Sequence, residues 1–310
     1  KITLQDEVVT SAHAKSMGGS QVFLEEGEKQ TVDTLLKCIL VASGNDASVA
    51  MAEYIGGSEE AFVQKMNERA AALGMENTHF VDCCGLTDSD EHYTTPRDIA
   101  IMSRELLLNF PQVEQYTTIW MEDITHVTAK GSSAFGLTNT NKLLRSYDGC
   151  IGVKTGFTDS ARRTLVSCAE RDGVRLIAVT LNAPNDWSDH AKMLDYGFEK
   201  VTLCEMKYDS SALSLSVVGS EKETVGVECG AVKLPLCNEQ KDKITAEIYM
   251  PKFIYAGLAA GEKVGEIHYL LNGNTIATAP LQTAESCVQK ERKTDFFTVI
   301  YKFIAGLLTR

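Results

Sequence analysis

The chain has 310 residues, 44% of them apolar and 23% charged, an ordinary composition for a globular protein that argues against disorder and against a coiled coil. Its 42 acidic and 30 basic residues give a formal net charge of −12, which repels polyphosphate and argues against nucleic acid as a partner. Its histidines and cysteines show neither H-E-x-x-H nor C-x-x-C spacing, so the sequence predicts no metal site and no cofactor.

The first third of the chain has the pattern of amphipathic helices. Thr31 and Ser58 are typical helix N-cap residues, and each precedes apolar residues that repeat with the period of a helix. Proline is well tolerated in the first turn of a helix, so another helix is expected from Thr95-Pro96 onward.

The polar residues 42–46 lie between two apolar helical runs, a position typical of a loop that faces a cleft. The alternative is a plain break, in which Gly44 ends one helix and Asn45 or Asp46 caps the next. Taken alone, the stretch favours the plain break, and only other functional residues nearby would reverse that preference.

Strands are expected in the middle of the chain. Residues 164–170 and 174–182 have strand composition and are joined through Asp172-Gly173, a signal for a tight hairpin. A closing helix is expected next, with Met193 and Leu194 facing inward. Helices before and after an antiparallel sheet predict an α+β domain.

Residues 151–158 precede this hairpin and contain Lys154-Thr155-Gly156. At the edge of a strand they would offer backbone hydrogen bonds to an extended peptide, room for its approach at Gly156, and a cation for its terminal carboxylate. The stretch therefore predicts a site that binds the end of a peptide. The alternative is a surface turn, because three common residues also recur by chance.

Beyond about Cys204 the sequence contains strand patterns only. Polar and apolar residues alternate over residues 213–217 and 244–248, and Asn272-Gly273 is a hairpin signal. These patterns predict a separate small β domain. It contains no catalytic constellation, so it is interpreted as a spacer or a partner surface.

Residues 295–310 place apolar side chains on one helical stripe, opposite Lys302. At about 1.5 Å per residue this helix would span roughly 23 Å, less than the ~30 Å hydrocarbon core, so it is expected to lie in the membrane surface. The alternatives are a helix docked on the β domain and part of a longer membrane-spanning segment.

Three motifs follow one another in order: Ser43-Gly44-Asn45, Asn139-Thr140-Asn141-Lys142 and Lys154-Thr155-Gly156. With the β domain and the tail, the series resembles the D-alanyl-D-alanine carboxypeptidases, the low-molecular-weight penicillin-binding proteins. The resemblance implies an α+β domain of the DD-peptidase and β-lactamase type, in which helices surround an antiparallel sheet, then a small all-β domain and a C-terminal amphipathic helix. The implied parts are a penicillin-binding domain lacking its N-terminal part, the β domain and the membrane-surface helix, over residues 1–203, 204–290 and 291–310.

The resemblance also implies a chemistry. A serine attacks the penultimate carbonyl of a peptidoglycan stem peptide ending in D-Ala-D-Ala, the terminal D-alanine leaves, and β-lactam antibiotics trap the same serine. Ser43, Asn45 and Lys154 would be catalytic. Such an enzyme works outside the cytoplasm, on the outer face of the bacterial cytoplasmic membrane. The residues that would bind the substrate are Lys154, Thr155, Gly156 and Phe157.

Two departures from the family pattern matter. No Ser-x-x-Lys occurs in the chain, so the nucleophile and its lysine are expected upstream of Lys1 in a longer protein, and the chain as given is expected to be inactive. Where the family usually has Ala-Gly-x-Cys, this chain has Ala161-Arg162-Arg163-Thr164. Arg162 and Arg163 either point to solvent, or one of them assists binding of the substrate carboxylate.

Two other functions stay open at this point. The missing serine also fits a non-catalytic, cell-wall-binding member of the fold. A β-lactamase shares the three motifs, although the β domain, the tail and the lack of an evident deacylating Glu-x-x-x-Asn element argue against it.

Overall fold

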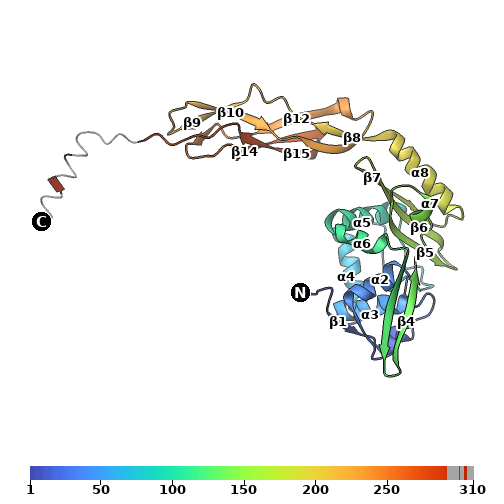
Figure 1. Cartoon of the computed structure of the whole chain (residues 1–310). Helices are drawn as coiled ribbons and strands as arrows, with labels where there is room; N and C mark the ends of the chain where they lie inside the picture. The colour runs from blue at the N-terminus through green and yellow to red at the C-terminus, as the bar shows by residue number, and fades with distance from the viewer. Residues whose placement is uncertain (292–299, 301–303, 306–310) are drawn as a thin grey trace. The chain divides into compact units, whose positions relative to one another are not determined.

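In a computed structural model of the protein, residues 1–291, 300, 304 and 305 are described. The chain divides into two compact units, Lys1–Lys200 and Val201–Arg310, and Figure 1 shows the helices gathered in the first unit and strands in the second. The tail helix is expected over residues 291–310. Of this range the structure describes residues 291, 300, 304 and 305, and the rest of the expected helix lies outside the described residues. Among the residues described, no helix is both long enough and apolar enough to cross a membrane.

Three side chains start the main helices of the first unit, as the sequence predicts. The hydroxyl oxygens of Thr31, Ser58 and Thr95 each accept a hydrogen bond from the backbone N–H three residues later, a donor that has no partner inside the helix. A short 3-10 helix covers Pro111–Val113. The α-helices of this unit are α1 (Ala12–Lys15), α2 (Val32–Leu40), α3 (Asn45–Gly56), α4 (Glu59–Ala72), α5 (Pro96–Asn109), α6 (Glu114–Thr117), α7 (Leu143–Ser146) and α8 (Asp186–Lys200).

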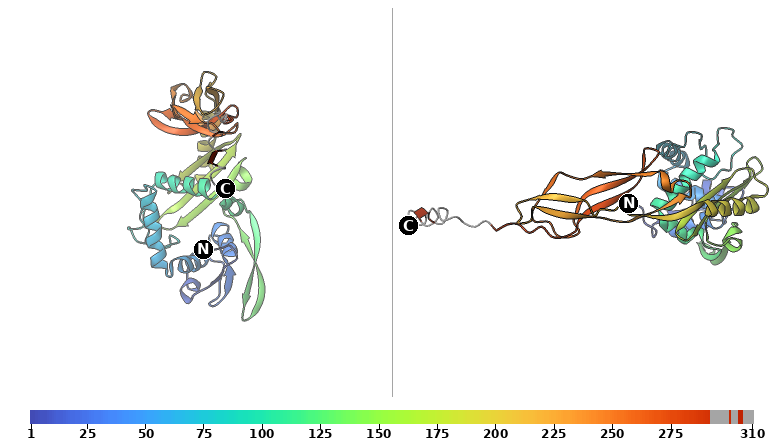
Figure 2. Two further views of the ribbon diagram at one scale, coloured as in Figure 1. Left: turned by 90° about the vertical axis from the view of Figure 1, so that its left-hand side faces the viewer. Right: turned by 90° about the horizontal axis from the view of Figure 1, so that it is seen from above.

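One apolar core of the first unit lies between α2, α3 and a long hairpin that runs beside them (Figure 1 and Figure 2). Leu35 of α2 and Val49 of α3 are fully buried in the same cluster as Leu137 of the hairpin. Burying a side chain of this size contributes about 1.5–3 kcal/mol. The strands around this core are the hairpin β3 (Met121–Thr128) and β4 (Gly131–Thr138), and the pair β1 (Glu7–Val9) and β2 (Lys29–Thr31).

The link between α2 and α3, residues 41–44, contains Ser43 and leads into Asn45 and Asp46 at the start of α3. The cap expected from Asn45 or Asp46 is wrong, because α3 begins at Asn45 and Gly44 occupies the N-cap position without a side-chain hydrogen bond. Asp46 is buried instead, and its carboxylate accepts hydrogen bonds from the N–H of Val22 at 3.2 Å and of Leu24 at 3.0 Å. This carboxylate therefore ties an extended segment of the chain to the start of α3.

An antiparallel sheet in the order β5-β6-β7 forms the rest of the first unit. The turn between β6 and β7 is the expected one, since Asp172 and Gly173 have φ values of 51° and 76°, the left-handed region that a tight hairpin requires. Two small apolar cores lie against β6. Leu107 of α5 is buried in the core that contains Cys168, and Leu194 of α8 is buried in the core that contains Ala169. The strands are β5 (Cys150–Thr158), β6 (Arg162–Arg171) and β7 (Val174–Thr180).

Helix α8 buries a narrow stripe. Leu194 is buried as expected, but Met193 is 40% exposed, so the inward position predicted for it is wrong. The buried residues of α8 are Asp186, His190 and Leu194, spaced four apart, which is one face of a helix. The polar members of this stripe were not expected from an apolar periodicity, because their partners lie on the sheet.

The buried imidazole of His190 should make the fold sensitive to acid. Its Nδ1 lies 2.5 Å from Ser167 Oγ and its Nε2 lies 2.9 Å from Thr180 Oγ1. Burial lowers the pKa of His190 from 6.5 to about 4, although the charges of Asp186 and Asp189 act in the opposite direction. The unfolded chain then takes up a proton before the folded one does. The stabilisation is fully present above pH 6.5 and is lost as the pH falls toward 4, by on the order of 3 kcal/mol.

Urea denaturation between pH 7 and pH 4 measures this dependence. In His190→Gln the side chain retains donor and acceptor groups but does not titrate, so the free energy of unfolding should change less steeply with pH. Equal slopes in the two proteins would contradict the role assigned to His190.

The second unit is an all-β domain. Its main sheet has the order β12-β14-β15-β10-β9-β13, and β8 pairs with β11. The hairpin expected at Asn272-Gly273 joins β14 to β15, and Leu215, Ile267 and Leu281 are buried in the core. The expected fold class, an α+β domain followed by an all-β domain, is confirmed. The strands are β8 (Val201–Met206), β9 (Ser214–Val218), β10 (Thr224–Cys229), β11 (Val232–Cys237), β12 (Ile244–Tyr249), β13 (Phe253–Tyr255), β14 (Lys263–Leu271) and β15 (Asn274–Thr283), with a 3-10 helix at Lys241–Lys243.

Candidate active site

A cleft of about 1040 Å³ opens in the first unit, where the link between α2 and α3 meets strand β5. Its lining also includes residues from a loop before α5, from β6 and from the start of α8. The structure brings each of the predicted site residues into this cleft. Those residues are Ser43, Asn45, Lys154, Thr155, Gly156 and Phe157.

Lys154 connects the two sides of the cleft. Its Nζ donates a hydrogen bond to Ser43 Oγ at 2.7 Å and another to the carbonyl oxygen of Thr155 at 2.8 Å. Burial lowers the pKa of Lys154 to about 8, because an ammonium group is less well solvated here than in water. At neutral pH the side chain is still mostly protonated, so it holds a positive charge beside the Ser43 hydroxyl.

The backbone around Ser43 is held in an uncommon conformation. Ser43 has a φ of 61°, which residues other than glycine rarely adopt, and the N–H of Gly44 donates to a carbonyl of α2 at 3.0 Å. Asn45 is fixed by two bonds, from its N–H to Ser20 O at 2.8 Å and from its Nδ2 to Gly18 O at 2.9 Å. Both polar side chains are therefore positioned by the fold itself.

Strand β5 is an edge strand. β6 pairs with one side of it, and no strand in the described part of the chain pairs with the other, so an extended peptide can add there. Thr155 Oγ1 lies 2.5 Å from Thr140 Oγ1, and Phe157 is 64% exposed. A Cβ at Gly156 would collide with Thr164 Oγ1 on β6, so the missing side chain makes room for that threonine, and the room for a peptide expected there stays a prediction.

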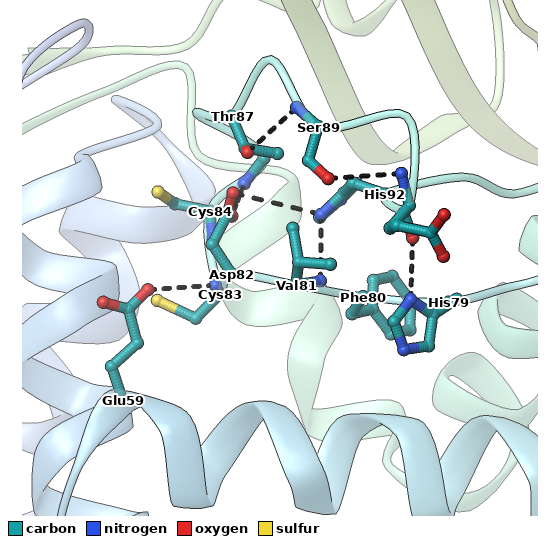
Figure 3. A network of polar contacts seen from close by, with 12 residues as sticks. Glu59, His79, Phe80, Val81, Asp82, Cys83, Cys84, Thr87, Ser89 and His92 are labelled. Atoms are coloured by element: carbon teal, nitrogen blue, oxygen red, sulfur yellow. Dashed lines mark hydrogen bonds and ion pairs between the residues drawn. The ribbon is translucent and has the colours of Figure 1, made fainter.

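The loop over residues 80–94 forms a wall of the cleft that the sequence did not reveal. Figure 3 shows its internal contacts: an oxygen of Asp82 accepts a hydrogen bond from the N–H of Cys84 at 2.9 Å. Glu59 of α4 accepts one from the N–H of Cys83 at 3.2 Å, which attaches the loop to that helix. The composition of residues 80–94 is typical of turns, and composition alone does not indicate whether a turn faces a cleft or solvent.

The two arginines that follow β5 lie differently. Arg162 is exposed, with a φ of 59°. Arg163 lines the cleft, and its Nε and Nη2 donate to the two carboxylate oxygens of Asp186 at 3.0 and 2.9 Å. Its guanidinium carbon lies 5.4 Å from the ring centre of Trp187, a cation–π contact. The solvent-facing alternative is therefore wrong for Arg163.

Polar groups in the cleft include hydroxyls, the amide of Asn45, the imidazole of His92, two lysines and the Arg163–Asp186 pair. Over residues 1–291, 300, 304 and 305, no group of three or more His, Cys, Asp or Glu side chains is arranged to hold a metal ion. The cysteines, all of which lie within this part of the chain, are free thiols.

Comparison with known protein families identifies both units. Residues 1–185 match the family described as D-alanyl-D-alanine carboxypeptidase, and residues 198–289 match the C-terminal domain of penicillin-binding protein 5. A domain of helices and antiparallel strands with this cleft, followed by this β domain, defines a peptidase of the penicillin-binding class. The chain belongs to the D-alanyl-D-alanine carboxypeptidase family, so the resemblance seen in the sequence is confirmed.

Relatives and solved structures agree with this assignment. The chain is 37% identical to the carboxypeptidase DacF of Bacillus subtilis, covering 97% of this chain and 76% of the relative, and 29% identical to DacA of Escherichia coli, covering 98% and 74%. Its structure is similar to that of PBP3, a peptidoglycan synthesis regulatory factor from Streptococcus pneumoniae, with a TM-score of 0.74, 26% identity and coverage of 93% and 86%. Penicillin-binding protein 5 from Haemophilus influenzae has a TM-score of 0.65 at 27% identity, with coverage of 93% and 84%.

Proposed function

We propose that this protein is a serine-type D,D-carboxypeptidase that removes the terminal D-alanine from peptidoglycan stem peptides. The observation that carries the proposal is the 2.7 Å contact between Lys154 Nζ and Ser43 Oγ, because it sets a cation and a hydroxyl together beside a free strand edge. Membership of the carboxypeptidase family supports it, as do the names of the B. subtilis and E. coli relatives.

The proposed reaction runs through an acyl-enzyme. A serine hydroxyl attacks the carbonyl carbon of the penultimate D-alanine, the C–N bond to the terminal D-alanine breaks, and the leaving amine takes up a proton. Water then hydrolyses the ester and frees the serine. A β-lactam ring opens on the same serine and leaves a more persistent ester, so penicillins inhibit the enzyme.

Five of the six predicted residues have a part in this reaction. Ser43 passes a proton to the leaving amine, and Asn45 holds either the substrate amide or the catalytic lysine. The ammonium of Lys154 and the hydroxyl of Thr155 bind the terminal carboxylate. The N–H of Phe157 is one donor to the oxyanion, and the nucleophile's own N–H is the other.

The proposed nucleophile belongs to a Ser-x-x-Lys motif, which does not occur in the 310-residue sequence. We infer that a segment preceding Lys1 in a longer protein contributes this serine and its lysine. It follows that the 310-residue chain by itself neither hydrolyses the peptide nor is acylated by penicillin.

The proposal also covers location and domain roles. The enzyme would act outside the cytoplasm, on the outer face of the bacterial cytoplasmic membrane, where it meets peptidoglycan stem peptides. Residues 1–203 would be the penicillin-binding domain, residues 204–290 a spacer, and residues 295–310 would lie in the membrane surface. The order of the first two parts is supported by the two family matches along the chain.

Incubation of the longer protein with a fluorescent penicillin, followed by mass spectrometry, tests the function. We expect one long-lived adduct on the serine of Ser-x-x-Lys and no adduct on the 310-residue chain. The longer protein should release D-alanine from a D-Ala-D-Ala peptide, and this release should stop once penicillin has acylated the protein. Fast turnover of penicillin would instead identify a β-lactamase. If the longer protein forms no adduct and does not turn penicillin over, a non-catalytic protein that binds the cell wall is favoured.

A further inference from the structure

Arg163 is fixed at one end of the cleft. Two of its nitrogens bond to Asp186, which is itself buried, and the guanidinium lies against the Trp187 ring. An arginine held in this way loses little further freedom when it binds a ligand. The side chain is still 41% exposed, and within the described residues Nη1 has no hydrogen-bond partner, so donors remain available on the cleft side.

The lining of this cleft is cationic, although the whole chain has a net charge of −12. Lys142, Lys154 and Arg163 bring positive charge, whereas Asp186 is the one carboxylate among the described lining residues. Asp186 offsets the charge of Arg163 and leaves two lysines uncompensated. A field of this sign attracts a ligand that carries more than one carboxylate.

The strand register sets the position of Arg163 along a bound peptide. Arg163 pairs with Phe157 across β5 and β6, and Phe157 lies two residues beyond Thr155, about 6.6 Å along the strand. Because side chains alternate along a strand, Thr155, Phe157 and Arg163 belong to one face of the sheet. A peptide on the open side of β5, with its terminal carboxylate at Thr155 and its penultimate carbonyl at the N–H of Phe157, has its third residue from the C-terminus next to Phe157. It lies two strand spacings, about 9.6 Å, from the strand of Arg163, so a long side chain on that residue would cross Phe157 to reach the guanidinium.

We propose that Arg163, positioned by Asp186, is a specificity-determining residue that binds a side-chain carboxylate on the third residue from the C-terminus of the peptide. The inference rests on the proposed carboxypeptidase function and adds a substrate class to it. The preferred peptides carry a free carboxylate at that residue, and peptides with a neutral amide there bind more weakly.

Two synthetic tripeptides ending in D-Ala-D-Ala, which differ only in a side-chain carboxylate or carboxamide on the first residue, test this inference. Release of D-alanine by the longer protein gives kcat/KM for each peptide, and titration of the 310-residue chain by calorimetry gives each Kd without chemistry. We expect about a tenfold preference for the carboxylate peptide, seen in KM and Kd and not in kcat, as for one charge-assisted hydrogen bond at a partly exposed site. In Arg163→Gln the ratio should fall to about one, with the carboxamide peptide affected less than about twofold.

Two further variants sharpen the test. Arg162→Gln removes the same charge one residue away and should retain the preference. Asp186→Asn distinguishes two explanations of the preference for the carboxylate peptide. If the fixed position of the guanidinium is responsible, loss of its anchor should reduce the preference, whereas a general positive field would increase the preference once the Asp186 carboxylate is removed. Circular dichroism checks that each variant is folded.

The outcomes are distinct. An unchanged ratio in Arg163→Gln, or a larger ratio in Asp186→Asn, would overturn the inference. If the longer protein hydrolyses neither peptide, the proposed function fails instead, and the ratio of the two Kd values for the 310-residue chain still decides the role of Arg163.

Discussion

Replacing Lys154 by alanine in the longer protein is expected to slow acylation by penicillin by about 100- to 1,000-fold. The variant removes the positive charge that stabilises negative charge developing in the cleft, and it leaves the Ser43 hydroxyl without the donor that lies 2.7 Å away. The second-order rate constant for labelling by a fluorescent penicillin measures the effect. The value of kcat/KM for release of D-alanine should fall in parallel.

Two variants control this experiment. Lys130 lies in the turn of the β3–β4 hairpin with its side chain 84% exposed, so Lys130→Ala should leave both rates unchanged. Lys154→Arg keeps the charge but replaces a compact ammonium by a planar guanidinium, and it should restore only part of the rate. Labelling of Lys154→Ala within about threefold of the wild-type rate would remove Lys154 from the proposed mechanism.

Asp46→Ala is expected to lower the free energy of unfolding of the 310-residue chain by about 3–5 kcal/mol. The N–H groups of Val22 and Leu24 both lose their acceptor, and each buried donor left without one costs about 1–3 kcal/mol. A small cavity adds to the loss. Urea denaturation measures the change. Because Asp46 follows directly on the Ser43–Asn45 link, binding of a D-Ala-D-Ala peptide should weaken as well.

An exposed carboxylate provides the matched control. Asp88→Ala removes a similar group from the surface and should change stability by less than about 0.5 kcal/mol. Asp46→Asn keeps the shape but can accept fewer hydrogen bonds, so its stability should fall between those of the wild type and Asp46→Ala. A loss below about 1 kcal/mol in Asp46→Ala would show that water replaces the carboxylate.

Helix starts could be predicted where the decisive interaction is local. Thr31, Ser58 and Thr95 each bond to an N–H three residues away, so the preference of one residue is enough to indicate the start. Asp46 has the same local preference, yet its carboxylate binds Val22, 24 residues earlier in the chain. A hydrogen-bond partner this far away in the chain competes with the role of Asp46 as a helix cap, and no periodic pattern in the sequence indicates that partner.

The candidate site shows the same division. The order of its motifs was enough to select Ser43 and Lys154 together, and they are in contact although 111 residues separate them. The anchoring of Arg163 by Asp186 could not be predicted, because it joins the start of β6 to the start of α8, whose approach depends on how the whole sheet packs. The loop wall at residues 80–94 was missed for a similar reason.

The open side of β5 accepts any extended chain, including a second copy of this protein. An internal segment that paired there would cover the ammonium of Lys154 without supplying a counter-ion, which is unfavourable, and two molecules that each carry −12 repel one another. A chain terminus brings its own negative charge and avoids that penalty. Preference for peptide ends over peptide interiors, and resistance to edge-to-edge aggregation, are thus expected from the same lysine.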